Sequence, residues 1–157
     1  RRPAYFGSRG GMMFVVFDLD GTLSLNAHRQ HHIDKEPKDW AAWHAACVAD
    51  PPSRVVIAAL VAHVRDGHRV EIWSGRSDVV RRETEAWLEE RSITSWRLTR
   101  MRPAKDHRPD VELKRKWLHE ARVDGDAPDL VYDDRDRVVA MWREEGVACF
   151  QVAPGPF

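Results

Sequence analysis

The chain has 157 residues, which is enough for one domain with a sizeable hydrophobic core. Its 25 Lys and Arg residues balance 25 Asp and Glu residues, so no overall basic charge indicates a nucleic-acid partner, although a local basic site stays possible. Hydrophobic residues make up 43% and charged residues 32% of the chain, which excludes an intrinsically disordered protein.

The beginning of the chain, residues 1–11, is rich in Arg and Gly and is expected to be a tag or linker outside a domain of residues 12–157. No apolar run is long enough for a membrane helix, and no secretory signal precedes the domain. Cys47 and Cys149 both lie in apolar stretches and are predicted to be buried and unpaired. We therefore expect a soluble cytoplasmic protein without a membrane partner.

A buried strand is predicted at Phe14–Phe17, where four apolar residues precede Asp18, Leu19, Asp20 and Gly21. Open α/β sheets carry their functional groups at such strand ends. Gly21 allows the backbone to turn, so Asp18 and Asp20 can meet at one site for a hard divalent cation such as Mg²⁺. An acidic turn without a metal is the alternative.

The segment 24–52 follows as an insertion before the rest of the sheet. Its His28, His31 and His32 fit a solvated loop or a rim on the substrate side better than a metal site, since no cysteine pair lies near them. A short helix is predicted from Trp40 to Val48. Its tryptophans, Trp40 and Trp43, are expected to pack the helix down, with stacking on a nucleobase as the alternative.

The next elements are a helix over 53–64, a strand at Arg69–Trp73 and a helix over 78–90. Ser74, Gly75 and Arg76 follow the strand, and Arg76 could donate two hydrogen bonds to a phosphate. Taken alone, this sequence is also a common loop at the start of a helix.

A third strand is predicted within 93–101, around Trp96–Leu98. The basic segment 97–108 contains four arginines, one lysine and one histidine opposed only by Asp106. Such a segment is either a solvated loop or a path for substrate phosphates.

The last elements are a helix beginning at Pro109, a strand at Asp129–Tyr132, a helix over 138–142 and a strand over 148–152. Asp133 and Asp134 end the fourth strand. Two adjacent carboxylates repel each other, and a bound cation would offset that repulsion.

The motifs Asp18–Gly21, Ser74–Arg76 and Asp133–Asp134, with a lysine in the helix after Pro109, resemble in this order the four motifs of the haloacid dehalogenase (HAD) superfamily of phosphatases. The resemblance implies that Asp18 is the nucleophile and Asp20 the general acid and base. It also implies a lysine near a helix start, for which Lys114 fits better than Lys116 because Asp110, four residues earlier, can orient it.

The same resemblance implies a doubly wound, mainly parallel five-stranded α/β sheet with a small cap formed by residues 24–52. The residues implied in phosphate binding are Ser74, Gly75, Arg76 and Asp110. The implied Mg²⁺ ligands are Asp18, the main-chain carbonyl of Asp20, Asp134 and, in the outer sphere, Asp133.

The stretch 133–157 is similar in more detail to the end of the 3′-phosphatase domain in phage polynucleotide kinase/phosphatase enzymes. This implies Mg²⁺-dependent removal of a 3′-phosphate from a nucleic-acid end. The chain departs from that family in lacking a phosphate-binding kinase loop and in the longer insertion between the first two motifs. A phosphatase of free nucleotides or other small monoesters, and an inactive HAD-like module that binds nucleic acid, are the alternatives. The choice between DNA and RNA, the base preference and the oligomeric state are left open.

Overall fold

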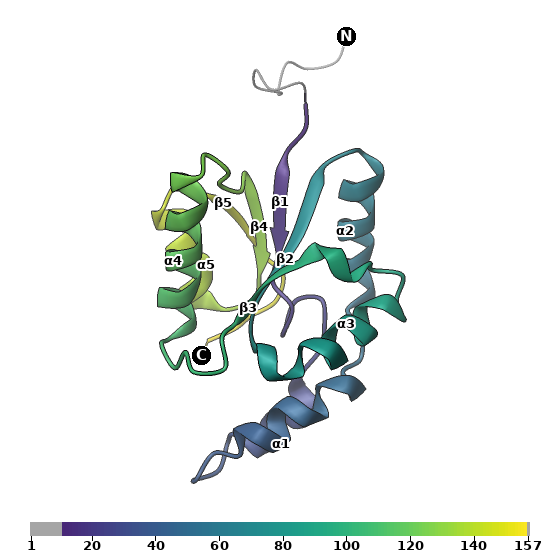
Figure 1. Cartoon of the computed structure of the whole chain (residues 1–157), viewed down its shortest axis with the longest axis vertical. Helices are drawn as coiled ribbons and strands as arrows, with labels where there is room; N and C mark the ends of the chain where they lie inside the picture. The colour runs from purple at the N-terminus through teal and green to yellow at the C-terminus, as the bar shows by residue number, and fades with distance from the viewer. Residues whose placement is uncertain (1–10, 157) are drawn as a thin grey trace.

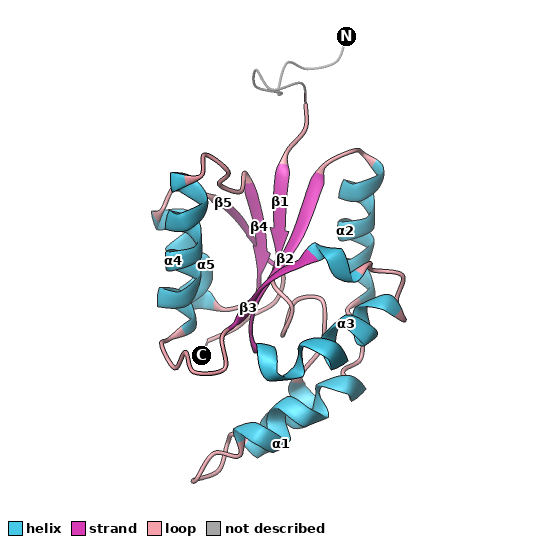
Figure 2. Ribbon diagram, viewed as in Figure 1, coloured by secondary structure: helices cyan, strands magenta, loops and turns pink. Residues whose placement is uncertain are grey.

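The computed structural model describes residues 11–156 and contains a five-stranded parallel sheet flanked by helices (Figure 1 and Figure 2). The strands are β1 (Phe14–Phe17), β2 (Arg69–Ser77), β3 (Leu98–Arg102), β4 (Leu130–Asp133) and β5 (Ala148–Gln151). The α-helices are α1 (Trp40–Ala45), α2 (Arg54–Arg65), α3 (Arg81–Glu89), α4 (Asp110–Val123) and α5 (Asp136–Glu144). Short 3₁₀ helices are η1 (Ala27–His32), η2 (Ala46–Ala49), η3 (Asp78–Val80) and η4 (Ser95–Arg97). The strand order β3-β2-β1-β4-β5 confirms the predicted doubly wound α/β fold.

The sheet is covered on both faces, with α4 and α5 on one side and α2 and α3 on the other (Figure 1). Successive residues of β1 point to opposite faces: Val16 packs in the core beneath α4 and α5, whereas Val15 and Phe17 pack in the core beneath α2 and α3. All four β1 side chains are buried. The run of four apolar residues is therefore explained by burial on both faces of a central parallel strand.

A polar network surrounds Glu71 in β2. Its carboxylate accepts hydrogen bonds from Arg69, Trp73 and Thr99. Burial by itself would raise the pKa of Glu71, but the hydrogen bonds from these three side chains lower it below its usual value. The network holds Glu71 in its ionised form.

The third strand begins later than the sequence predicts. Residues 95–97 form the 3₁₀ helix η4, and β3 starts at Leu98. Trp96 is exposed, with the Arg97 guanidinium stacked over its ring, so this aromatic residue is not part of the sheet. The apolar Trp96 side chain suggested a buried strand, but in the structure its ring packs against the Arg97 guanidinium at the surface.

The helix predicted after Pro109 is confirmed as α4, which begins at Asp110 and ends at Val123. The helix predicted over 78–90 is divided between η3 and α3. The last helix begins at Asp136, which is two residues before the predicted start. These differences move element ends without changing the order of the elements.

The segment 24–52 contains η1, α1 and η2, and backbone hydrogen bonds join its two ends. The Leu25 N–H donates to the Pro51 carbonyl at 2.8 Å, and the Ser53 N–H donates to the Leu23 carbonyl at 2.9 Å. The polar stretch that contains His28, His31 and His32 was predicted to be a solvated loop or a rim on the substrate side. This prediction is partly wrong, because the stretch forms η1 and carries the fully buried side chain of Arg29. The α1 part of this segment lies beyond the carboxyl ends of the strands (Figure 1).

Cys47 and Cys149 are free and buried, as predicted. Within residues 11–156, no helix is long and apolar enough to cross a membrane. The prediction of a tag or linker over 1–11 falls almost entirely outside the described residues. The cytoplasmic location stays a prediction.

Candidate active site

The acidic residues after β1 and β4 meet because these two strands are parallel neighbours. The Asp18 N–H donates to the Tyr132 carbonyl at 2.9 Å, which continues the pairing of the strands to the residue that leaves β1. Among the described residues, one group of side chains could hold a metal ion: Asp18, Asp133 and Asp134 each offer a carboxylate oxygen within 4.8 Å of the others. All three residues are buried.

Lys114 reaches this carboxylate group from α4. Its side chain is 1% exposed, and its Nζ lies 2.9 Å from Asp18 Oδ1 and 2.7 Å from Asp133 Oδ2. The runner-up, Lys116, is half-exposed and pairs with Glu120 on the surface of α4. Of the two lysines, the structure therefore brings only Lys114 to the predicted site.

The Asp110 carboxylate forms its ion pairs with Arg102 at 2.7 Å and with Arg135 at 3.0 Å rather than with Lys114, although the charges of Asp110 and Lys114 still shift each other's pKa toward the ionised form. Lys114 is oriented by Asp18 and Asp133 instead. The spacing of four residues places Asp110 and Lys114 on one face of α4, but two closer guanidinium groups take up the Asp110 carboxylate.

The charges of the group favour a divalent cation. Three buried carboxylates face one ammonium group, which leaves an excess of negative charge. Burial raises the pKa of Asp18 well above its usual range against the opposing effect of Lys114, and burial together with the adjacent Asp133 raises the pKa of Asp134 to about 6. Oxygen ligands and surplus negative charge fit Mg²⁺.

Asp20 points away from this group. Its carboxylate accepts hydrogen bonds from Arg76, with Nη2 at 2.5 Å and Nε at 3.2 Å, and from Nη2 of Arg29. Burial would raise the pKa of Asp20, but Arg76 and Arg29 hold it well below its usual range. The Asp20 side chain is thus an ionised carboxylate that is engaged by two arginines. The main-chain carbonyl oxygen of Asp20 stays the predicted metal ligand.

Arg76 lines the cavity, and its predicted contact with a phosphate stays a prediction. Its guanidinium group is almost fully buried and is used by Asp20, Asp50 and Thr84, at 3.0 Å from Asp50 Oδ2 and 3.1 Å from Thr84 Oγ1. The two parallel hydrogen bonds predicted for a phosphate are made to Asp20. The sequence could not show this, because Asp20 lies 56 residues earlier in the chain.

Arg29 and Asp50 are site residues that the sequence analysis missed. Arg29 is 0% exposed and donates to both carboxylate oxygens of Asp50 at 2.8 Å, to Asp20 and to the Trp43 carbonyl at 3.1 Å. His28 adds a 2.8 Å contact between its Nε2 and Asp50 Oδ1. An arginine within a polar, histidine-rich stretch carries no periodic signal of burial, and its partner is 21 residues away.

The other predicted phosphate-binding residues lie at the end of β2. Ser74 is fully buried, and its Oγ accepts a hydrogen bond from the Arg76 N–H at 3.1 Å. Gly75 lines the cavity and touches Asp110: a Cβ at this position would lie 2.1 Å from Asp110 Oδ1. The glycine is therefore required by the close approach of β2 to α4.

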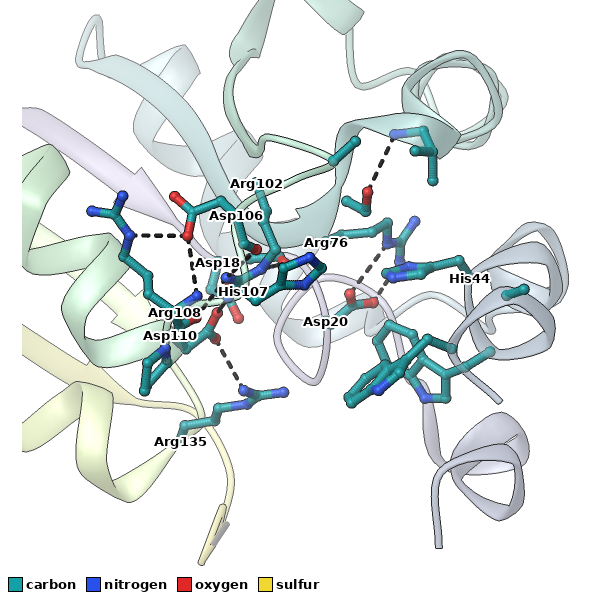
Figure 3. A pocket seen from close by; sticks show the side chains of 18 residues that line it. Asp18, Asp20, His44, Arg76, Arg102, Asp106, His107, Arg108, Asp110 and Arg135 are labelled. Carbon is teal, nitrogen blue, oxygen red and sulfur yellow. Dashed lines mark hydrogen bonds and ion pairs between the residues drawn. The ribbon is translucent and has the colours of Figure 1, made fainter. Parts of the chain in front are cut away.

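A cavity of about 600 Å³ opens above Asp18 and Asp20. Figure 3 shows His44 on one side of Asp20, and Arg108, Asp110 and Arg135 on the other. This volume is within the range of small-molecule sites.

The basic segment 97–108 contributes only part of its charge to the cavity. Arg102 lines the wall, but its guanidinium donates to the Gly75 carbonyl at 2.8 Å and to Asp110. Arg100 pairs with Glu120 at 2.7 Å. His107 and Arg108 are exposed residues of the cavity wall, so a path for phosphates through this segment would depend on them.

Comparison with known proteins identifies the family. Residues 12–157 match the family described as "Polynucleotide kinase PNKP phosphatase domain". A putative bifunctional polynucleotide kinase/RNA ligase of Autographa californica nuclear polyhedrosis virus is 31% identical over 133 residues, covering 83% of this chain and 18% of that protein.

Solved structures agree with this match. A chain in the structure of a Pnkp1/Rnl/Hen1 complex is 30% identical, with a TM-score of 0.77, covering 98% of this chain and 50% of that chain. The class C acid phosphatase from Bacillus anthracis is 18% identical, with a TM-score of 0.62, covering 94% of this chain and 69% of that one, and shows the shared fold. The chain spans half or less of the viral relative and of the Pnkp1/Rnl/Hen1 neighbour. With its parallel sheet and its acidic strand ends, the chain belongs to the HAD-type polynucleotide kinase phosphatase domains and is a phosphatase.

Proposed function

We propose that the chain is a Mg²⁺-dependent polynucleotide 3′-phosphatase that acts in nucleic-acid end repair. The observation that carries the proposal is Asp18, a buried carboxylate at the end of β1 that lies 2.9 Å from the Lys114 ammonium and opens onto the cavity. The family supplies the class of substrate, because the matching family model describes a polynucleotide kinase phosphatase domain.

In the first step an Asp18 carboxylate oxygen attacks phosphorus, the new O–P bond forms, and the bond from phosphorus to the 3′-oxygen of the nucleic acid breaks. This produces an aspartyl-phosphate. Lys114 offsets the repulsion between the carboxylate and the phosphate, since its charge lies beside Asp18. Asp18 and Asp134 would hold a Mg²⁺, which supplies further positive charge against the phosphate oxygens.

Asp20 transfers the proton that the leaving oxygen requires. Because Arg76 and Arg29 keep free Asp20 ionised, this proton enters with the substrate: a phosphate monoanion bound beside Asp20 adds negative charge, raises the pKa of this carboxyl group and passes its proton to it. After donating the proton, the Asp20 carboxylate accepts one from the water that attacks the aspartyl-phosphate. The bond between phosphorus and the Asp18 oxygen breaks, and inorganic phosphate leaves as the monoanion with the proton from Asp20, so both side chains are carboxylates again.

The substrate is tested with two oligonucleotides of one sequence, one phosphorylated at the 3′ end and the other at the 5′ end. The proposal predicts phosphate release from the 3′ end only, dependent on Mg²⁺. If the protein hydrolysed mononucleotides but neither oligonucleotide, it would still be a phosphatase, but its substrate would be a free nucleotide and not a nucleic-acid end. Binding of the oligonucleotides with no release from any phosphate ester would contradict a phosphatase.

A further inference from the structure

Trp40 is a large aromatic side chain in the wall of the catalytic cavity. It is 49% exposed, whereas its neighbour Trp43 is buried. The Trp40 ring meets the Trp43 ring edge to face, at 5.9 Å between centroids. Trp43 explains how α1 packs against the domain, whereas Trp40 stays half-exposed in the cavity wall, where the Lys38 Nζ lies 5.9 Å from the centroid of its ring.

The position of Trp40 is fixed relative to the catalytic residues. Asp39 caps α1 by accepting a hydrogen bond from the Ala42 N–H at 2.9 Å. The guanidinium group of Arg29 lies 3.8 Å from the centroid of the Trp43 ring and donates to both the Trp43 carbonyl and Asp20. One buried arginine therefore links the helix that carries Trp40 to the carboxylate that transfers protons.

The cavity offers two different surfaces to a ligand. Trp40, Ala41 and Val79 contribute apolar surface to its wall. Arg108 and His107 belong to the same wall and are exposed hydrogen-bond donors, although the Arg108 guanidinium also pairs with Asp106 of this wall at 2.9 Å. A nucleotide has this same division between a flat, weakly polar base and an anionic backbone.

We infer that Trp40 is a stacking platform for the terminal base of the nucleic-acid strand whose 3′-phosphate reaches Asp18. This inference rests on the proposed function and specifies how the end is held. Stacking accepts every base, because each presents a π-face, so Trp40 provides affinity for a base at the strand end without selecting its identity.

The test compares two single-stranded substrates of one sequence with a 3′-phosphate. In one, the last nucleoside is intact, and in the other a tetrahydrofuran residue replaces it, so the phosphate stays and the base is absent. Base–aromatic stacking predicts that loss of the base lowers kcat/KM of the wild-type protein about 5- to 150-fold. In Trp40→Ala this ratio should fall toward one, and Trp40→Phe should restore most of it.

Trp40→Leu keeps an apolar side chain against Trp43 without an aromatic face, and it should lose the preference for the base as fully as Trp40→Ala. Trp96→Ala is the matched control, because Trp96 is 65% exposed and lies outside the residues that line the cavity. It should keep the wild-type ratio between the two substrates.

The inference is overturned, with the proposed function intact, when the wild-type protein releases the 3′-phosphate but treats the two substrates alike. It is also overturned when Trp40→Ala and Trp40→Leu keep the wild-type ratio. If the wild-type protein hydrolyses a small phosphate ester and neither oligonucleotide, both the proposed function and the inference are overturned.

Discussion

Replacing Arg29 by methionine tests the buried ionic network most severely. Two arginines, Arg29 and Arg76, balance two buried carboxylates, Asp20 and Asp50. Arg29→Met keeps a long apolar stem and removes one positive charge, which leaves a surplus carboxylate in the interior. Removing one partner of a buried ion pair costs about 3–5 kcal/mol.

We expect a loss of about 3 kcal/mol, at the lower end of that range, because Arg76 still pairs with both carboxylates. For a domain of this size, each kcal/mol lowers Tm by about 2–4 °C, so Tm should fall by about 6–12 °C. The free energy of unfolding is measured by urea titration and Tm by circular dichroism. Asp50→Asn in the same chain removes the surplus charge, and the double variant should lose less stability than the sum of the two single variants.

The matched control is Arg122→Met, which removes a partly exposed arginine that pairs with Glu145. Exposed ion pairs contribute about 0–1 kcal/mol, so this variant should stay close to the wild-type stability. If Arg29→Met were no less stable than Arg122→Met, the network could not be what fixes η1 and α1 to the site, and the reasoning from burial would be refuted.

Three further predictions concern other parts of the chain. Gly21→Ala should abolish phosphatase activity, because Gly21 has a φ of +83° and an added Cβ would lie 2.2 Å from Asp134 Oδ2. The control Gly125→Ala should stay active, because Gly125 also has a positive φ, of +69°, but an added Cβ would meet no atom within 4 Å. Glu71→Gln should destabilise the protein at pH 7 and much less at pH 3. The lowered pKa means that the ionised Glu71 contributes stability above the unfolded-state pKa of about 4.3 and loses it as the pH falls through the folded-state value, which urea unfolding at both pH values checks. Mg²⁺ should raise Tm of the wild-type protein and restore the activity that EDTA removes. The Tm of Asp134→Asn should change little when Mg²⁺ is added. An equal rise of Tm in both proteins would contradict the proposed metal site.

The parts of the site that could be predicted are those fixed by strand periodicity. Asp18 and Asp133 stand at the ends of neighbouring parallel strands, and a short apolar run before each acid was enough to predict a strand end there. Lys114 was preferred to Lys116 through the family resemblance and its spacing from Asp110, and the structure brings Lys114 to Asp18 while Lys116 pairs with Glu120 on the surface. The strand ends follow from local sequence and the regular geometry of α/β folds, whereas the grouping of these residues into one site was implied by the family resemblance.

The parts that could not be predicted depend on partners distant in the chain. Arg76 follows β2 as a phosphate-binding residue would, but Asp20 and Asp50 occupy its guanidinium group in the folded protein. Arg29 lies in a stretch that is polar throughout, and it is buried because two carboxylates from other segments surround it. A pattern of hydrophobicity does not report a charged side chain whose burial is stabilised by ion pairing.

The identity of the nucleophile is tested most directly by stopping turnover with acid and locating the phosphoryl group by peptide mass mapping. With a 3′-phosphorylated oligonucleotide, we predict that the wild-type protein carries a phosphoryl group on the peptide containing Asp18. Asp18→Asn should carry none and release no phosphate, with a circular dichroism spectrum that shows it is folded. Release of phosphate by Asp18→Asn at the wild-type rate would contradict the account, because no other carboxylate could then be excluded as the nucleophile.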